Sequence, residues 1–534
     1  MRTLLIKNGF VIDGTGTPGV NSDILISGNK IIRVGHFNDS SADEVIDVSG
    51  LTVTPGFIDI HTHFDLQILS DRQYFNGLSQ GVTSIIVGLC GIGFAPCPTG
   101  LLLNNIRYSK GICGYCPSED YSWNTFDQYL GRLSGSAVNV SAAATHTAAR
   151  LCGSGFADRP LKGAELDRAK DSVRESFESG ASAFSTGLAY YPQGYSDTEE
   201  LTELCKVVKD YNGVVMVHMR PSTEGFPLSP AGEVAHVAME TGVKIHILHY
   251  KTLHNYHCGE PEMVFEPFRK AVDAGCDISY EYYPYYCGSS YGLMPFAGWV
   301  SEGGYEAALA RLKDMKLRQK IIDDSMNGFK EICRRPGSPI VLSHLPATPE
   351  YIGMTMRQAA DIRGEDDMTA LINLLIENEL EVLFVWREPD DPDIRSRLKR
   401  DMLYLLDTPS YTIGSDSIPV GVLPHPRLFG CYGKMLRLVR GWNYPLEKYI
   451  RKVTGYCADR FDLPDIGYIK EGKRADLAIF DYEEVRDNAT FQNPIQPCDG
   501  FKYVIVGGQP ALIEGRTTGL FNGEALRRKV NPHR

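Results

Sequence analysis

Residues 55–65 spell PGFIDIHTHFD, a short apolar run that ends in two histidines and an aspartate. Pro55-Gly56 breaks the preceding structure, and the apolar run is typical of a buried parallel strand. Because side chains alternate between the two faces of an extended chain, His61 and His63 point the same way and can bind one ion. Two nearby histidines are often plain core or surface residues, but their place at the end of an apolar strand favours metal binding. The stretch therefore predicts a strand that carries two metal ligands to the rim of a barrel.

Apolar segments typical of strands recur eight times between residues 57 and 416, with helical patterns such as 165–179 and 229–241 in the gaps. The eight segments are Phe57–Ile60, Ser84–Cys90, Val138–Ala144, Ala181–Thr186, Val214–His218, Lys244–His249, Asp277–Tyr283 and Tyr411–Asp416. Alternating strands and helices form parallel βα units, and eight such units close into a (β/α)8 TIM-like barrel. Two further strand candidates exceed this count. We assign 340–344 to an insertion and leave 382–386 as an extra element.

Both ends of the chain have a sequence pattern typical of β-structure, with short strand-like segments separated by Gly, Asn and Asp turns. Neither end alone offers enough strands for an independent core, so we predict one discontinuous β-sandwich domain made from both. The α/β chain then divides into the β-sandwich (1–54 plus 466–534), the metal-dependent hydrolase barrel (55–286 plus 343–465) and a small inserted subdomain (287–342).

The charge of the chain limits its partners. With 54 basic and 66 acidic residues, the formal charge is −12. This balance disfavours non-specific binding to nucleic acid or to an anionic membrane, which needs a basic surface. The N-terminus has only a short apolar run before charged residues and Asn8-Gly9, so it predicts neither a signal peptide nor a spanning helix. We expect a cytoplasmic protein whose partner is a small molecule, with no nucleic acid and no membrane.

Thirteen cysteines are scattered along the chain, several of them in apolar strands. An odd number with no regular framework fits buried free thiols in a reducing compartment. One of the thirteen is a candidate metal ligand. The segment Cys113-Gly114-Tyr115-Cys116 could be a redox pair or half of a structural zinc site, but no second Cys-x-x-Cys accompanies it. The sequence leaves its role open.

Metal-capable or acidic residues end five of the eight predicted strands. These residues are His61, His63, Cys90, His218, His249 and Asp416. Each alone has a structural explanation, as a small buried thiol, a hydrogen-bonded core histidine or a helix cap. All of them fall at the C-terminal rim, however, where a βα-barrel gathers its catalytic groups. Their shared position therefore predicts an active site.

The residue types narrow the chemistry of this site. Imidazole together with thiolate suits zinc, and a catalytic zinc keeps one position open for water or substrate. A divalent ion lowers the pKa of its water from ~15.7 toward ~7 and polarises a carbonyl oxygen. Asp416 can then take the proton and pass it to a departing nitrogen. This is amide hydrolysis in outline.

The chain resembles the amidohydrolase superfamily and, within it, the D-aminoacylase (N-acyl-D-amino-acid deacylase) family, nearly from end to end. A cysteine at the end of strand two, in place of the carboxylated strand-four lysine of many relatives, points to the deacylases in particular. The resemblance rests on residues 55–63, Gly88-Leu89-Cys90-Gly91, residues 185–192, His218-Met219-Arg220, His249-Tyr250-Lys251, Tyr283-Pro284-Tyr285, Gly414-Ser415-Asp416, His425-Pro426-Arg427 and residues 475–481.

The resemblance implies a zinc site and its ligands. By the match of motifs, Cys90, His218 and His249 hold a tightly bound Zn²⁺. His61 and His63 form a possible second, weaker position. The number of metals bound stays open at the level of the sequence.

The resemblance also implies the residues that act on substrate. Asp416 matches the general acid/base of the family. Tyr283 and Arg427 match residues that bind the carboxylate of the substrate, which suits an Arg fork facing a planar anion. Lys251 and Ser289 match positions that line the pocket.

The predicted function is zinc-dependent hydrolysis of the amide bond of N-acyl amino acids, with the D configuration expected. One alternative is a cyclic amidase of the hydantoinase, dihydroorotase or lactamase kind, which the absence of a lysine from Ala183-Phe184-Ser185-Thr186 disfavours. The other is a catalytically silent scaffold, which the complete ligand set disfavours. Departures from the family at 221–224 and at Trp386-Arg387 leave the substrate preference open.

Overall fold

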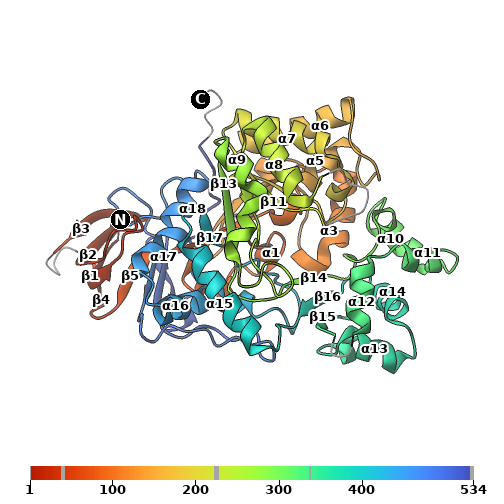
Figure 1. Cartoon of the computed structure of the whole chain (residues 1–534). Helices are drawn as coiled ribbons and strands as arrows, with labels where there is room; N and C mark the ends of the chain where they lie inside the picture. The colour runs from red at the N-terminus through yellow and green to blue at the C-terminus, as the bar shows by residue number, and fades with distance from the viewer. Residues whose placement is uncertain (1, 38–41, 222–227, 336–337, 530–534) are drawn as a thin grey trace.

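The computed structural model describes residues 2–37, 42–221, 228–335 and 338–529. Within these residues, eight parallel strands form a barrel, of which β11, β13 and β17 are labelled near the middle of Figure 1. In chain order they are β6 (Phe57–Asp59), β7 (Val82–Val87), β8 (Asn139–Ala142) with its continuation β9 (Ala144–Thr145), β10 (Phe184–Gly187), β11 (Val214–His218), β12 (Lys244–Ile247), β13 (Ile278–Tyr282) and β17 (Tyr411–Ile413). A parallel β-bridge between Thr62 and Ser417 joins the ends of the first and last of these strands and closes the barrel. The predicted barrel is confirmed.

Helices cover the outside of the barrel, so its strands are buried on both faces. All six residues of β7 are buried, for example. The helices α5 (His146–Gly153), α6 (Ala164–Glu178), α7 (Thr198–Asp210) and α8 (Pro230–Thr241) pack against one another in this order, in the upper part of Figure 1. Side chains of Asp197 and Ser229 cap the N-termini of α7 and α8. No helix in the described residues has the length and apolar character that a bilayer crossing requires.

The two ends of the chain share one nine-stranded sheet. Its N-terminal strands are β1 (Thr3–Val11), β2 (Val20–Ser27), β3 (Lys30–Gly35), β4 (Glu44–Asp47) and β5 (Thr52–Pro55). Its C-terminal strands are β18 (Leu477–Phe480), β19 (Phe501–Val506), β20 (Gln509–Ile513) and β21 (Arg516–Thr517). Antiparallel pairing of β5 with β18 joins the two sets, and residues from both, such as Ile24 and Ile479, fill one separate core. The β-domain built from both ends is thereby confirmed.

An insertion between β13 and β17 lies at the right of Figure 1. It contains the antiparallel sheet β14 (Ser289–Tyr291), β16 (Leu383–Trp386) and β15 (Ile340–His344), in that order. Five helices accompany it within the described residues: α10 (Tyr305–Lys313), α11 (Arg318–Asp323), α12 (Asn327–Arg334), α13 (Met356–Arg363) and α14 (Asp367–Glu377). The two surplus strands therefore pair with each other. We propose that the inserted subdomain ends at Trp386 and not at the expected residue 342. Sequence pattern missed this because pairing between distant strands leaves no local signal.

Candidate active site

Three donor atoms converge at the C-terminal rim of the barrel, where β7, β11 and β12 end. Cys90 Sγ lies 3.4 Å from His218 Nδ1 and 3.9 Å from His249 Nε2, and the two ring nitrogens are 2.8 Å apart. Burial lowers the pKa of His249 to about 4 and the pKa of His218 well below its usual value. Both rings are therefore neutral and offer lone pairs, the form that binds a metal. The structure brings the predicted tight-site residues together.

The backbone at this rim is held in an unusual conformation. Cys90, His249 and Asp416 have φ values of 53°, 40° and 52°, in the left-handed region that non-glycine residues rarely adopt. Each such residue costs on the order of 1–3 kcal/mol, so the surrounding structure must enforce it. Three site residues sharing this conformation indicate that the loops are shaped to aim these side chains.

The contacts around Cys90 show how that conformation is enforced. Gln193 Nε2, fully buried, donates to the Cys90 carbonyl at 3.0 Å, and the Gly91 amide donates to Ser185 Oγ at 3.0 Å. A Cβ on Gly187 would lie 1.9 Å from the Cys90 carbonyl oxygen, so only glycine fits there. Sequence reasoning missed Gln193, because a polar residue in the 3-10 turn η3 (Gln193–Tyr195) carries no local sign of its distant partner.

His61 and His63 stand beside this cluster. His61 Nε2 is 3.4 Å from Cys90 Sγ, and His63 Nε2 is 3.2 Å from Asp416 Oδ1. The other ring nitrogen of His61, Nδ1, contacts the buried carboxylate of Glu281. Burial raises the pKa of Glu281, but the neighbouring His61 and its hydrogen bonds outweigh burial and bring the pKa to about 2. Glu281, within the tyrosine-rich strand β13, is a second residue that sequence reasoning missed.

Asp416 faces both the histidines and a buried arginine. Its Oδ2 lies 2.8 Å from Arg427 Nη1, and its backbone N–H donates to the carbonyl of His61 at 2.8 Å. Burial raises the pKa of Asp416, but the Arg427 guanidinium and the His61 ring outweigh it and hold the pKa well below its usual range. The carboxylate is therefore ionised and able to accept a proton.

The residues predicted to bind substrate meet around the ring of Tyr283. The Arg427 guanidinium lies 4.6 Å and the Lys251 ammonium 3.3 Å from the ring centre. Lys251 Nζ also donates to the carbonyls of Tyr283 and Tyr285, at 3.1 and 2.6 Å. Ser289 instead donates its hydroxyl hydrogen to the carbonyl of Phe384 at 2.6 Å, so its side chain ties β14 to β16.

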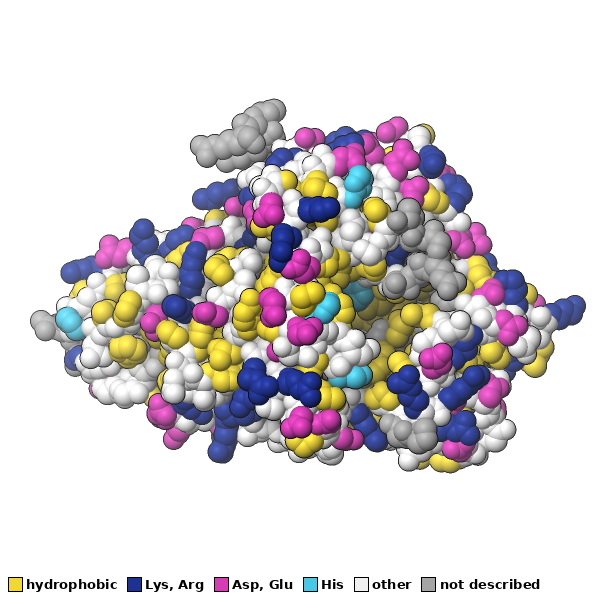
Figure 2. Space-filling model, in the orientation of Figure 1, with side chains coloured by type: hydrophobic (Ala, Val, Ile, Leu, Met, Phe, Trp, Pro, Cys, Tyr) yellow, Lys and Arg dark blue, Asp and Glu magenta, His cyan; other side chains and the backbone are white. Residues whose placement is uncertain are grey.

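A cavity of about 440 Å³ lies over these groups. The barrel contributes His63, Cys90, His218, His249 and Asp416 to its lining, and the insertion and its flanks contribute Ser289, Met294, Trp386 and Arg387. Figure 2 shows the surface hollowed near the middle of the molecule, with hydrophobic and histidine side chains around the hollow. The insertion therefore forms one wall of the site.

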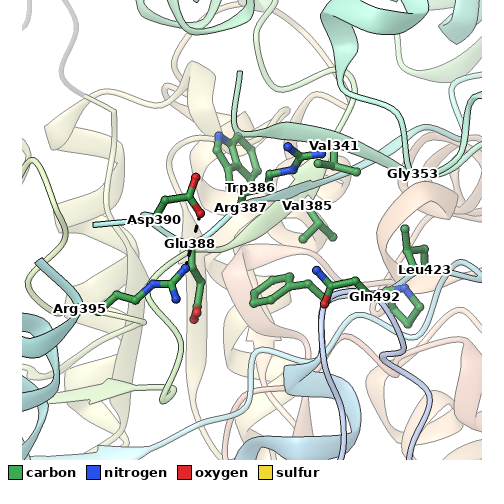
Figure 3. A pocket seen from close by; sticks show the side chains of 12 residues that line it. Val341, Gly353, Val385, Trp386, Arg387, Glu388, Asp390, Arg395, Leu423 and Gln492 are labelled. Atoms are coloured by element: carbon green, nitrogen blue, oxygen red, sulfur yellow. Dashed lines mark ion pairs between the residues drawn. The ribbon is translucent and has the colours of Figure 1, made fainter. Parts of the chain in front are cut away.

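A second cavity, of about 570 Å³, shares Trp386 and Arg387 with the first (Figure 3). It lies between β15, β16 and the loops that carry Leu423 and Gln492. Its described lining residues include neither histidine nor cysteine. The smaller cavity is therefore the candidate active site.

Comparison with known proteins shows the family of the chain. The model of the Amidohydrolase family matches residues 44–512. The chain belongs to the amidohydrolase family. It is 29% identical to a D-aminoacylase of Alcaligenes xylosoxydans xylosoxydans, over 98% of this chain and 97% of the relative. It is also 29% identical to an N-acyl-D-glutamate deacylase from the same organism, over 95% and 92%.

Solved structures agree with this placement. The N-acyl-D-glutamate deacylase of Bordetella bronchiseptica, crystallised with zinc and a phosphonate mimic of the tetrahedral intermediate, is 25% identical and superimposes with a TM-score of 0.80, covering 98% of this chain and 99% of that chain. An L-hydantoinase of Arthrobacter aurescens is 16% identical with a TM-score of 0.57, covering 99% of this chain and 100% of that chain, and shares the fold alone. Of these two structures, the deacylase therefore resembles this chain more than the hydantoinase does.

Proposed function

We propose that this amidohydrolase is a zinc-dependent hydrolase of the amide bond in N-acyl amino acids of D configuration. The observation that carries the proposal is the convergence of Cys90, His218 and His249 beside the ionised carboxylate of Asp416, at one end of a cavity. The deacylase relatives, which align over almost the whole chain, support it.

The donor set fits zinc. One sulfur and two imidazole nitrogens, all on buried or half-buried side chains, are ligands that zinc prefers, and the cavity leaves a position open for substrate. His61, His63 and the shared Cys90 form the second, weaker position of this proposal. A bound zinc polarises the acyl carbonyl and acidifies a water molecule.

Asp416 moves the proton. Its Oδ1 lies near the histidine pair while Oδ2 is held by Arg427, so one oxygen stays directed at the reacting centre. Ionised, Asp416 accepts a proton from the attacking water. It then returns that proton to the departing nitrogen, which frees the amino acid.

Arg427 and Tyr283 bind the α-carboxylate of the substrate. Arg427 is 1% exposed, and apart from its ion pair with Asp416 its guanidinium nitrogens make no hydrogen bond in the described part of the chain. Buried donors of this kind need acceptors, and a carboxylate supplies two. Lys251 and Ser289 line the pocket beside them, and the Ser289 hydroxyl donates to the carbonyl of Phe384 in the wall.

The cyclic amidase alternative is less well supported. The strand that carries the bridging lysine in many relatives, β10, here reads Phe184-Ser185-Thr186-Gly187. Ser185 is already committed to the Gly91 amide. The sulfur of Cys90 occupies the place where a bridging ligand is needed, between the two proposed positions.

We also propose a cytoplasmic location. All thirteen cysteines are free thiols. Free thiols in this number are typical of a reducing compartment.

Hydrolysis of a panel of N-acetyl D- and L-amino acids by zinc-loaded protein, scored by release of amine, tests the function. We expect turnover of D substrates, little turnover of L substrates, and loss of both in Asp416→Asn. Opening of hydantoin or dihydropyrimidine rings without cleavage of any N-acyl amino acid would contradict the proposal.

A further inference from the structure

A separate group of buried donor atoms lies next to His63. We propose that His63, Asp65 and Cys113 form a further metal site, distinct from the one formed by Cys90, His218 and His249. One ligand-capable atom of each residue lies within 4.8 Å of the other two. The three residues are 3%, 0% and 0% exposed, so water cannot solvate these atoms.

His63 has a nitrogen to spare for this site. Its Nε2 faces Asp416 at 3.2 Å, whereas its Nδ1 is buried and has no hydrogen-bond partner among the described residues. A histidine that binds metal through one ring nitrogen usually donates the N–H of the other to a carboxylate, and the Asp416 carboxylate faces Nε2. An unpaired buried nitrogen is costly, and an ion bound to Nδ1 removes that cost.

Asp65 is held in place but lacks a cation. The Gly88 amide donates to its Oδ1 at 2.7 Å, and the Tyr129 hydroxyl donates to its backbone carbonyl at 3.1 Å. The first bond fixes the carboxylate and the second the backbone, and Oδ2 is left facing Cys113. Within the described chain, neither a lysine nor an arginine pairs with it. A fully buried carboxylate is expensive without a positive partner, which a divalent ion supplies.

Cys113 completes the set. It is the last residue of α3 (Thr99–Cys113), and its Sγ is 3.9 Å from Asp65 Oδ2. Two ligands of one tetrahedral zinc lie roughly 3.5 Å apart, so a small inward shift suffices. The C-terminal end of a helix also favours a cation. Cys116 contacts Ser118 Oγ at 3.1 Å instead, so the Cys-x-x-Cys motif supplies one ligand and not two.

Cobalt titration of the full-length apoprotein tests this site, because Co²⁺ bound to thiolate absorbs in the near ultraviolet. Cys90→Ala removes the thiolate of the proposed catalytic site. We expect this variant to keep a cobalt–thiolate band, Cys90→Ala/Cys113→Ser to lose it, and the matched control Cys90→Ala/Cys116→Ser to retain it. We also expect Asp65→Asn in the Cys90→Ala background to weaken cobalt binding at least tenfold. Absence of a band in Cys90→Ala, or a band that persists without Cys113, overturns the proposal.

The number of metal ions bound per chain tests the proposed site independently. Cys113→Ser should hold one metal ion fewer per chain than the parent protein after equilibration with zinc, whereas Cys116→Ser should match the parent. Should the cysteine variants fail to fold by near-ultraviolet circular dichroism, the loss expected in Asp65→Asn decides the question. Equal metal content in Asp65→Asn and the parent counts against the site. None of these measurements depends on hydrolysis, so the outcome is separate from that of the proposed function.

Discussion

Arg427 Nη1 lies 2.8 Å from Asp416 Oδ2; both side chains are buried, and Asp416 lines the active-site cavity. One arginine thereby holds the acid/base carboxylate and faces the position proposed for the carboxylate of the substrate. The two roles can be separated, because only the second depends on the substrate having a carboxylate.

Arg427→Lys should therefore raise the KM for N-acetyl amino acids by about 10–100-fold, the value of a charged hydrogen bond of 1.5–3 kcal/mol. The lysine keeps a positive charge near Asp416 but cannot form the two-pronged contact. Steady-state kinetics with the acid and with its carboxamide analogue provide the measurement. An equal effect on both substrates would show that Arg427 acts through Asp416 alone.

Cys90→Ala should weaken the binding of the tight zinc ion by more than the 10–100-fold typical of residues behind a metal ligand, and turnover should fall in parallel. The reason is that Cys90 Sγ contacts both His218 and His61, so the two proposed metal positions share it. Zinc competition with a chelating dye gives the affinity. Cys205→Ala is the matched control, since that thiol is equally buried but lies on α7. Unchanged zinc affinity in Cys90→Ala would exclude it as a ligand.

Glu281→Gln should lower turnover and the affinity for a second metal ion by about 10–100-fold. The carboxylate contacts His61 Nδ1 and so sets which nitrogen of that ring faces Cys90 and Asp416. Glutamine keeps the shape and removes the charge. Calorimetric titration with metal gives the affinity, and the exposed Glu350→Gln is the control. A variant indistinguishable from the parent would leave Glu281 with a packing role only.

Stability should depend on pH through Lys452, which lies outside the active site. Burial lowers the pKa of Lys452 from 10.5 to about 8, while its ammonium donates to the carbonyls of Thr408 and Tyr411. The unfolded chain keeps this proton up to about pH 10.4 and the folded chain releases it near pH 8, so the free energy of unfolding should rise with pH between these values.

The size of that effect is about 3 kcal/mol, from 1.36 kcal/mol per unit of pKa difference. Lys452→Met lacks the titrating group. The difference in unfolding free energy between the parent and this variant should therefore grow in favour of the parent as pH rises from 7.5 to 9.5, measured by urea unfolding. The exposed Lys448→Met should follow the parent at every pH. A constant difference between parent and Lys452→Met would contradict the lowered pKa.

The local pattern of the sequence was enough to predict the barrel. The alternation of buried strands and amphipathic helices sets each βα unit, and the end of each strand sets which side chains reach the rim. His61, Cys90, His218, His249 and Asp416 could be predicted in this way, because each lies at the end of a strand or shortly after it, and the apolar run of that strand is visible in the sequence. The β-domain could be predicted because both ends carry the same strand and turn signals.

Tertiary structure alone decided the contacts between these units. Glu281 behind His61, Gln193 beneath Cys90 and the ion pair of Arg427 with Asp416 all join residues from different strands or loops. The pairing of β15 with β16, and the turn of Cys113 toward Asp65, belong to the same class. The physical reason is that side-chain periodicity reports which face of an element is buried, whereas the partner across a contact is fixed only when the barrel closes and sets the register between distant segments.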